Sequence, residues 1–122
     1  MPRTPVVLFK DDDGSVPLLE WFDKLSGKVQ DKCRLRIERL TEMGHELRRP
    51  EADYLRDGIY ELRVRHQSVN YRMLYFFYGQ TAAVLALGLQ KERIVSPKAI
   101  DLAVRRKEKF MLNPKKHTAE EE

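Results

Sequence analysis

The sequence predicts a small single domain of the α+β class, in which an antiparallel sheet carries a helical hairpin on one face and a C-terminal helix. Two changes of pattern predict this fold. Apolar residues recur at helical spacing between residues 17 and 43, and from residue 59 onward the pattern becomes the alternation typical of strands. Short polar turns separate the strand-like segments, as they do in a meander.

The length of the chain predicts one domain. Its 122 residues are enough for one core and short for two. We expect the element order β-α-α-β-β-β-α within residues 1–112, and a flexible charged tail over residues 113–122.

The N-terminal half begins with a short strand at Pro5–Lys10 (PVVLFK), which Asp11–Gly14 (DDDG) ends in a turn. A first helix follows, with Pro17 in its first turn, where proline is favoured. A second, longer helix runs from about Lys28 to Met43 and carries one apolar stripe among charged residues. The short connection between these helices predicts a helical hairpin.

The C-terminal half reads as three strands and a helix. After a loop over residues 45–58, Ile59–His66 (IYELRVRH) alternates between two faces, and Val69–Tyr78 returns as a second strand. Thr81–Leu89 (TAAVLALGL) is apolar on both faces, which predicts an interior strand covered on both sides. Ser96-Pro97 has the cap and first-turn pattern of a last helix.

Several classes of protein and site are excluded by composition. No apolar run approaches the roughly 18 residues of a membrane span, so we expect no membrane association. The one cysteine, Cys33, lies on the apolar stripe of the second helix, where a buried inert thiol in a reducing cytoplasm is expected. The three histidines lack zinc spacing, and Asp11–Asp13 lacks the ligand pattern of a calcium loop. We expect neither a metal ion nor a cofactor.

The positive charge of the chain points toward phosphates or acidic partners. There are 23 Lys and Arg against 19 Asp and Glu, a net charge of +4, and residues 91–116 are strongly basic. The most informative cation is Arg72, in the strand NYRMLYFFY. Because a strand repeats its face every two residues, Arg72 shares a face with Leu74, Phe76 and Tyr78. A guanidinium on such a face needs a partner or an anionic ligand, since burying it unpaired is costly.

Other cations lie where the fold would gather them. Arg63 and Arg65 occupy one face of the preceding strand, and a solvated strand face is the alternative interpretation, which we favour for Arg65 alone. Two basic residues, Lys91 and Arg93, follow the last strand, and Lys98 stands in the first turn of the last helix. If Arg72 faces the same side as Arg63, these cations form one basic patch.

Four segments in a fixed order resemble a known family: D-G-I-Y-E-L-R at Asp57–Arg63, Y-R-M-L-Y at Tyr71–Tyr75, L-A-L-G-L-Q-K at Leu85–Lys91 and S-P-K-A-I-D-L-A at Ser96–Ala103. Their order and spacing resemble the RelE/ParE toxin superfamily, in particular the HigB-like, phage Gp49-related branch of type II toxin–antitoxin systems. The resemblance covers about residues 5–110, including the helical hairpin.

The resemblance implies an endoribonuclease that cuts messenger RNA on the ribosome without a metal ion, by attack of a ribose 2′-hydroxyl on the adjacent phosphate. It implies neutralisation by a helix-turn-helix, HigA-like antitoxin in the cytoplasm. The residues implied to act in catalysis are Arg72 for transition-state charge, Arg63 for phosphate, Lys91 at the end of the last strand, and His66 by type. The candidate RNA-binding residues are Arg65, Arg93 and Lys98 from the basic patch, and Tyr71 by type. Tyr71 is also of a type that transfers protons.

Two departures from the family pattern keep other functions open. Gln90-Lys91 stands where many members have paired lysines, and no tyrosine follows Tyr78. ParE relatives share the fold but inhibit DNA gyrase by binding. The alternatives are therefore a gyrase inhibitor, or an inactive phage-derived remnant that binds nucleic acid or an antitoxin.

Overall fold

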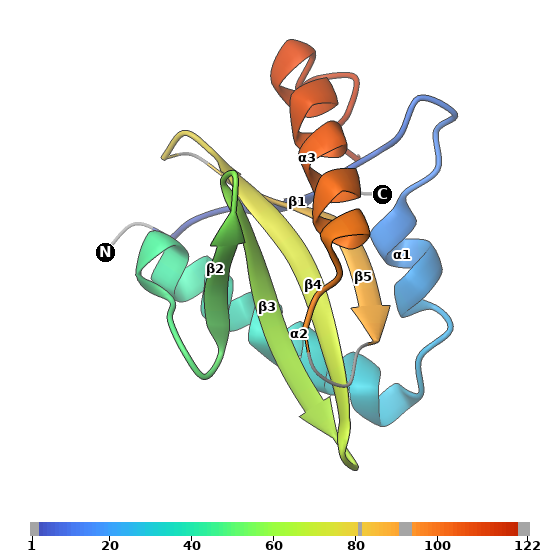
Figure 1. Cartoon of the computed structure of the whole chain (residues 1–122), viewed down its shortest axis with the longest axis vertical. Helices are drawn as coiled ribbons and strands as arrows, with labels where there is room; N and C mark the ends of the chain where they lie inside the picture. The colour runs from blue at the N-terminus through green and yellow to red at the C-terminus, as the bar shows by residue number, and fades with distance from the viewer. Residues whose placement is uncertain (1–2, 81, 91–93, 120–122) are drawn as a thin grey trace.

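A computed structural model describes residues 3–80, 82–90 and 94–119. The chain forms one five-stranded sheet with helices on both faces (Figure 1). In chain order the elements are β1 (Val6–Leu8), α1 (Pro17–Phe22), α2 (Gly27–Met43), the short 3-10 helix η1 (Gly44–Glu46), β2 (Ala52–Arg56), β3 (Ile59–His66), β4 (Val69–Tyr78), β5 (Ala82–Gln90) and α3 (Pro97–Leu112). The predicted α+β class and element order are confirmed, with one additional strand.

The strand order is β1-β5-β4-β3-β2. The meander of β3, β4 and β5 is antiparallel throughout, as predicted. The prediction of an antiparallel sheet is modified at one edge, because β1 pairs with β5 in parallel and makes the sheet mixed.

The additional strand, β2, lies in the segment predicted to be a loop. It pairs antiparallel with β3 through a hairpin turn at Asp57-Gly58, where both residues have positive φ. Strand β2 is five residues long and its sequence, ADYLR, does not alternate cleanly between apolar and polar residues. The turn residues were the available signal, because Asp-Gly between two strands is a strong hairpin sequence.

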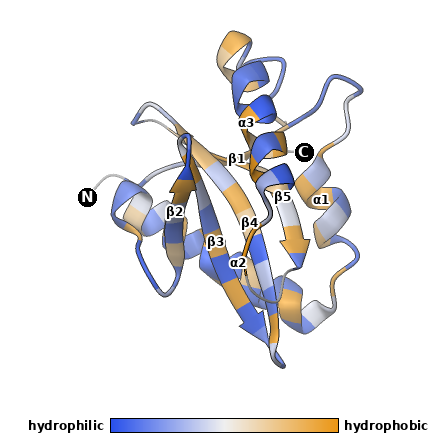
Figure 2. Cartoon of the chain, in the orientation of Figure 1, coloured by the Kyte–Doolittle hydropathy of each residue, from blue (hydrophilic) through white to orange (hydrophobic). Residues whose placement is uncertain are grey.

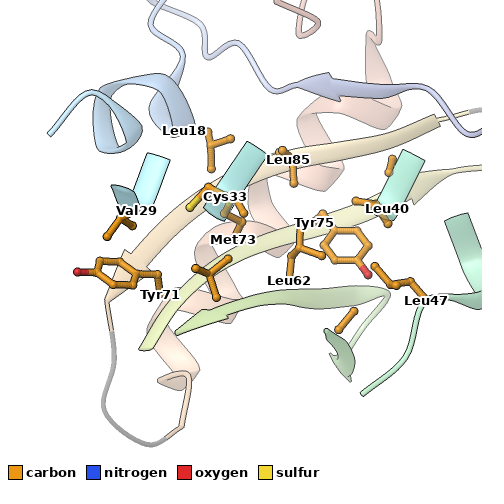
Figure 3. Close-up of a cluster of buried hydrophobic side chains, with 13 residues drawn as sticks. Leu18, Val29, Cys33, Leu40, Leu47, Leu62, Tyr71, Met73, Tyr75 and Leu85 are labelled. Carbon is orange, nitrogen blue, oxygen red and sulfur yellow. The ribbon is translucent and has the colours of Figure 1, made fainter. Parts of the chain in front are cut away.

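Helices α1 and α2 cover one face of the sheet, where they form the larger core (Figure 3). The N-terminus of α2 is capped by Ser26, whose hydroxyl accepts from the Val29 amide at 3.4 Å. Cys33 is fully buried among Leu18, Met73 and other apolar side chains of this core. The expectation of a buried thiol is confirmed, and burial raises the pKa of the Cys33 thiol to about 11.

Strand β5 is covered on both faces, as its uniformly apolar sequence predicts. On one face, a side chain at Gly88 would collide with the ring of Trp21, so glycine allows α1 to pack directly on the strand. On the other face, α3 packs over β4 and β5 through residues such as Ile100 and Phe110. Ser96 caps α3 by accepting from the Ala99 amide at 3.2 Å, as predicted.

Part of the segment expected to be a flexible tail packs against the domain. His117 is buried, its Nδ1 lies 2.8 Å from the carbonyl oxygen of Lys10, and its ring stacks on Phe9. Thr118 forms an antiparallel bridge with Phe9. Residues 113–119 therefore pack against Phe9 and Lys10 instead of extending from the domain. This contact joins two segments that are far apart in the sequence, so no local pattern predicts it. None of the helices in the described ranges is long and apolar enough to cross a membrane.

Candidate functional site

The hairpin of β3 and β4 places the two arginines of greatest interest opposite each other. Arg63 on β3 pairs in register with Arg72 on β4, and the next pair on the same face toward the turn is Arg65 with Asn70. Directly opposed residues in an antiparallel pair project from the same face of the sheet. The condition on which the predicted basic patch depended, that Arg72 faces the same side as Arg63, is therefore met.

These residues line a groove with a cavity volume of about 300 Å³, which we call the arginine groove. Its lining residues are Arg36, Pro50, Arg63, Val64, Arg65, Asn70, Tyr71 and Arg72. They come from α2, from the segment before β2, and from the part of the β3–β4 hairpin that extends beyond β2 at the bottom of Figure 1. Figure 2 shows that this end of the hairpin is largely hydrophilic. Four of these lining residues are arginines and none is acidic.

The groove lies where β3 loses its neighbouring strand. The ladder between β2 and β3 ends at the pair Ala52–Leu62, and the Arg63 amide then donates to the Glu51 carbonyl at 2.8 Å. Beyond this point, side chains of α2 replace the missing strand: Arg36 Nη1 donates to the carbonyl of Arg63. Further along, Lys32 Nζ donates to the carbonyl of Arg65 at 3.1 Å. Covering an open strand edge in this way keeps it from pairing with another chain.

Arg36 is held from its other side by a carboxylate. Glu51 Oε2 lies 3.8 Å from Arg36 Nε, and Arg39 binds both oxygens of the same carboxylate, at 2.8 and 3.1 Å. The hydrogen bond from Arg39 lowers the pKa of Glu51, with a further contribution from the nearby positive charges. Glu51 therefore favours its ionised form and supplies a counter-charge to Arg36 beside the groove.

Arg72 is buried, and the structure provides it with an internal partner. The residue is 5% exposed, and its Nε lies 2.6 Å from Oε1 of Glu61, which is 7% exposed. Of the two explanations that the sequence allowed for a buried guanidinium, a protein partner is therefore present. This contact does not remove Arg72 from the groove, because the residue is also part of the lining.

The other predicted site residues divide into three groups. Arg63, Arg65 and Tyr71 line the groove with Arg72. Arg65 is exposed, as a solvated strand face requires, and Tyr71 is buried, with its ring edge-on to Trp21. His66, at the end of β3, and Lys98, in the first turn of α3, are outside the lining. Lys91 and Arg93 lie outside the described residues.

Two lining residues with charged or polar side chains, Arg36 and Asn70, were not singled out from the sequence. Asn70 had an available signal, because the two-residue turn between β3 and β4 fixes it opposite Arg65. Arg36 had none, since α2 carries several arginines and only its packing against β3 selects one of them.

The groove has the properties of an anion site. Guanidinium groups bind phosphate oxygens through pairs of parallel N–H donors, and several in one concave site concentrate positive potential. Tyr71 is the one described lining residue with a side chain of a type that transfers protons. Within the described ranges, no group of three or more His, Cys, Asp or Glu could hold a metal ion.

Residues 20–108 match the model of a family of phage-derived, Gp49-like proteins. The chain belongs to this Gp49-like family. The match includes all of α2, parts of α1 and α3, and every lining residue of the arginine groove. The family is one of RelE-type toxins, so the resemblance drawn from the sequence is confirmed. Membership places the protein among the toxins of toxin–antitoxin systems, which act with an antitoxin partner. A comparison with curated protein sequences found no match.

Proposed function

We propose that this Gp49-like protein is a HigB-like endoribonuclease that cleaves messenger RNA on the ribosome. The observation that carries the proposal is the arginine groove: Arg36, Arg63, Arg65 and Arg72 line one cavity that contains no described acidic residue. RNA presents a chain of phosphates, and a groove of this charge and size suits one phosphate and its neighbours.

The chemistry follows from what such a groove does to a phosphate. The ribose 2′-oxygen attacks the adjacent phosphorus while a base takes the proton of the 2′-hydroxyl. The bond from phosphorus to the 5′-oxygen then breaks, and an acid protonates that oxygen. The products are a 2′,3′-cyclic phosphate and a 5′-hydroxyl. Negative charge builds up on the non-bridging oxygens in the transition state, and preorganised guanidinium donors stabilise it there.

Each arginine has a role in this scheme. Arg72 and Arg63, opposed across the hairpin, hold the reacting phosphate, and Arg72 supplies the transition-state donor. Arg36 approaches from α2 and Arg65 contacts the next phosphate toward the tip of the hairpin. Tyr71 and His66 are the candidates for proton transfer, and Lys91, Arg93 and Lys98 extend the contact with RNA.

The partner in the resting cell is a helix-turn-helix, HigA-like antitoxin. Family membership supports an antitoxin as such. The charge of the groove supports one that presents acidic side chains, because complementary potentials speed association and exclude wrong partners.

A cleavage assay on purified ribosomes tests the function. Wild-type protein is added to ribosomes that carry a defined message, and the products are sequenced and their ends analysed. We expect cuts in the ribosome-bound message that leave a cyclic phosphate and a 5′-hydroxyl.

Two variants on the same helix make the assay specific to the groove. Arg36→Ala removes a lining cation, and we expect its cleavage rate to fall at least tenfold. Arg34→Ala removes an arginine whose side chain is 60% exposed and pairs with Asp31, and we expect it to cleave at the wild-type rate. Growth arrest without cleavage, accompanied by broken DNA at gyrase sites, would replace the proposal by gyrase inhibition.

A further inference from the structure

Glu61 occupies an unusual place beside the arginine groove. It lies on β3 opposite Leu74, which puts it diagonally across from Arg72 on the same face of the hairpin. Its carboxylate reaches Arg72 Nε at 2.6 Å but is not part of the groove lining, whereas Arg72 is. The carboxylate therefore contacts the guanidinium without forming part of the wall of the groove.

The contact restrains the guanidinium. The group is planar, and its other four N–H donors are on the two Nη atoms. Holding Nε 2.6 Å from a buried carboxylate limits how far the guanidinium and its Nη donors can move. The pair is well shielded from water, with side chains of Arg72 and Glu61 only 6% and 9% exposed.

The charge of Glu61 also bears on the groove when no anion is bound. Arg63 lies directly opposite Arg72, and like charges in directly opposed positions repel. Glu61 is the one acidic residue in the buried set of the described chain, and it is in contact with Arg72. This counter-charge allows a buried guanidinium to stay beside Arg63 in the free protein.

We infer that Glu61 is a positioning residue, which holds the Arg72 guanidinium in the orientation needed to meet a phosphate in the arginine groove. The inference rests on the proposed function. Glu61 touches neither the phosphate nor the reacting atoms and acts through Arg72. Its effect is on the step in which the transition-state charge develops, because an arginine that must reorient during the reaction stabilises that charge less.

The test is a set of steady-state cleavage measurements over a range of message concentrations on three variants, corrected for the folded fraction. Glu61→Gln keeps the shape of the side chain and removes its charge, and Glu61→Leu removes the polar group as well. We expect kcat to fall about tenfold in Glu61→Gln and further in Glu61→Leu, with KM changed by less than about twofold. Asp31→Asn, which breaks the exposed Arg34–Asp31 ion pair on α2, serves as the control and keeps the wild-type kcat.

A purely structural Glu61 would give a different result. Both variants would then lower the melting temperature while kcat per folded molecule stayed at the wild-type value, and this outcome overturns the inference. If Glu61→Leu does not fold, Glu61→Gln alone decides between the two.

A second readout separates this inference from the proposed function. The Nε–H signal of Arg72 is followed by NMR while inorganic phosphate is added. We expect phosphate to shift this signal in the wild type and to shift it at least fivefold less in Glu61→Gln. A wild type that cleaves nothing but shows this difference overturns the proposed function and leaves the positioning role intact. Equal shifts in the two proteins, or no shift in the wild type, overturn the positioning role.

Discussion

Replacing Arg72 by alanine will destabilise the protein, and the structure gives the size of the effect. The change leaves Glu61 as an unpaired carboxylate in a site where the two side chains retain 6% and 9% exposure. Breaking a buried ion pair from one side costs about 3 to 5 kcal/mol in the free energy of unfolding. With an unfolding entropy of about 2.1 cal/mol/K per residue, a chain of 122 residues loses about 4 °C in melting temperature per kcal/mol. We therefore expect Arg72→Ala to melt about 12 to 20 °C below the wild type.

The loss of stability means that Arg72→Ala alone says little about catalysis, so a second change is needed. In the double variant Arg72→Met, Glu61→Leu both charges are replaced by apolar side chains of similar length. Exchanging a whole buried ion pair in this way is often neutral or stabilising. We expect the double variant to recover most of the lost melting temperature, within about 4 °C of the wild type, or about 1 kcal/mol.

Activity then separates a structural from a catalytic Arg72. If the guanidinium stabilises the transition state, the folded double variant cleaves about a hundredfold more slowly than the wild type, which corresponds to about 3 kcal/mol in activation free energy. The assay is single-turnover cleavage of ribosome-bound message, with thermal unfolding of the same samples. Wild-type cleavage by a stable double variant would refute the catalytic assignment, and a melting temperature of Arg72→Ala equal to the wild type would refute the energetic argument.

Three further predictions concern stability. Gln67–Ser68 forms the β3–β4 turn with positive φ at both residues, so Asn-Gly in their place should raise the free energy of unfolding by about 1 kcal/mol in urea titrations; an unchanged midpoint would contradict this. His117→Ala should lower the free energy of unfolding by about 2 kcal/mol, because its ring is buried against Phe9. If the C-terminal segment were free, the same titration would show no loss. Hydrogen bonds from Lys109 and, to a smaller extent, Lys116 lower the pKa of Asp12 to about 2. The contribution of Asp12 to the free energy of unfolding is therefore full above pH 3.8 and is lost as the pH falls toward 2. Asp12→Asn should flatten that part of the pH–stability curve, and a curve that keeps its slope would exclude this role.

Much of the site follows from the sequence through one turn. A two-residue connection at Gln67–Ser68 pairs residue 66 with 69, and counting outward pairs 63 with 72 and 65 with 70. The same count places Glu61 diagonally from Arg72, so the internal partner of the buried guanidinium was within reach of sequence reasoning. The sequence prediction did not include this partner, because it left open which face of the sheet carries Arg72 and compared Arg72 only with the apolar residues of its own strand.

Other parts of the fold are not encoded in local patterns. The parallel pairing of β1 with β5 depends on the path of the chain through both N-terminal helices, which periodicity does not describe. The burial of His117 results from contact between the two ends of the chain. The choice of Arg36 over the other arginines of α2 depends on the angle at which the helix crosses β3.

The position of Arg36 also explains why an anion site forms at this edge of the sheet. Strand β2 begins at Ala52, which pairs with Leu62, so its ladder with β3 reaches no further along β3. The carbonyls of Arg63 and Arg65 therefore need donors that β2 does not supply. Helix α2 supplies them from long cationic side chains, Arg36 and Lys32, because apolar side chains would leave these carbonyls unsatisfied. The same requirement that protects the open edge thus brings positive charge to the edge of β3, beside Arg63 and Arg72. The carboxylates of Glu51 and Glu61 are committed to Arg36, Arg39 and Arg72 and are not part of the groove lining, so the positive charge of the four lining arginines is left for a phosphate to neutralise.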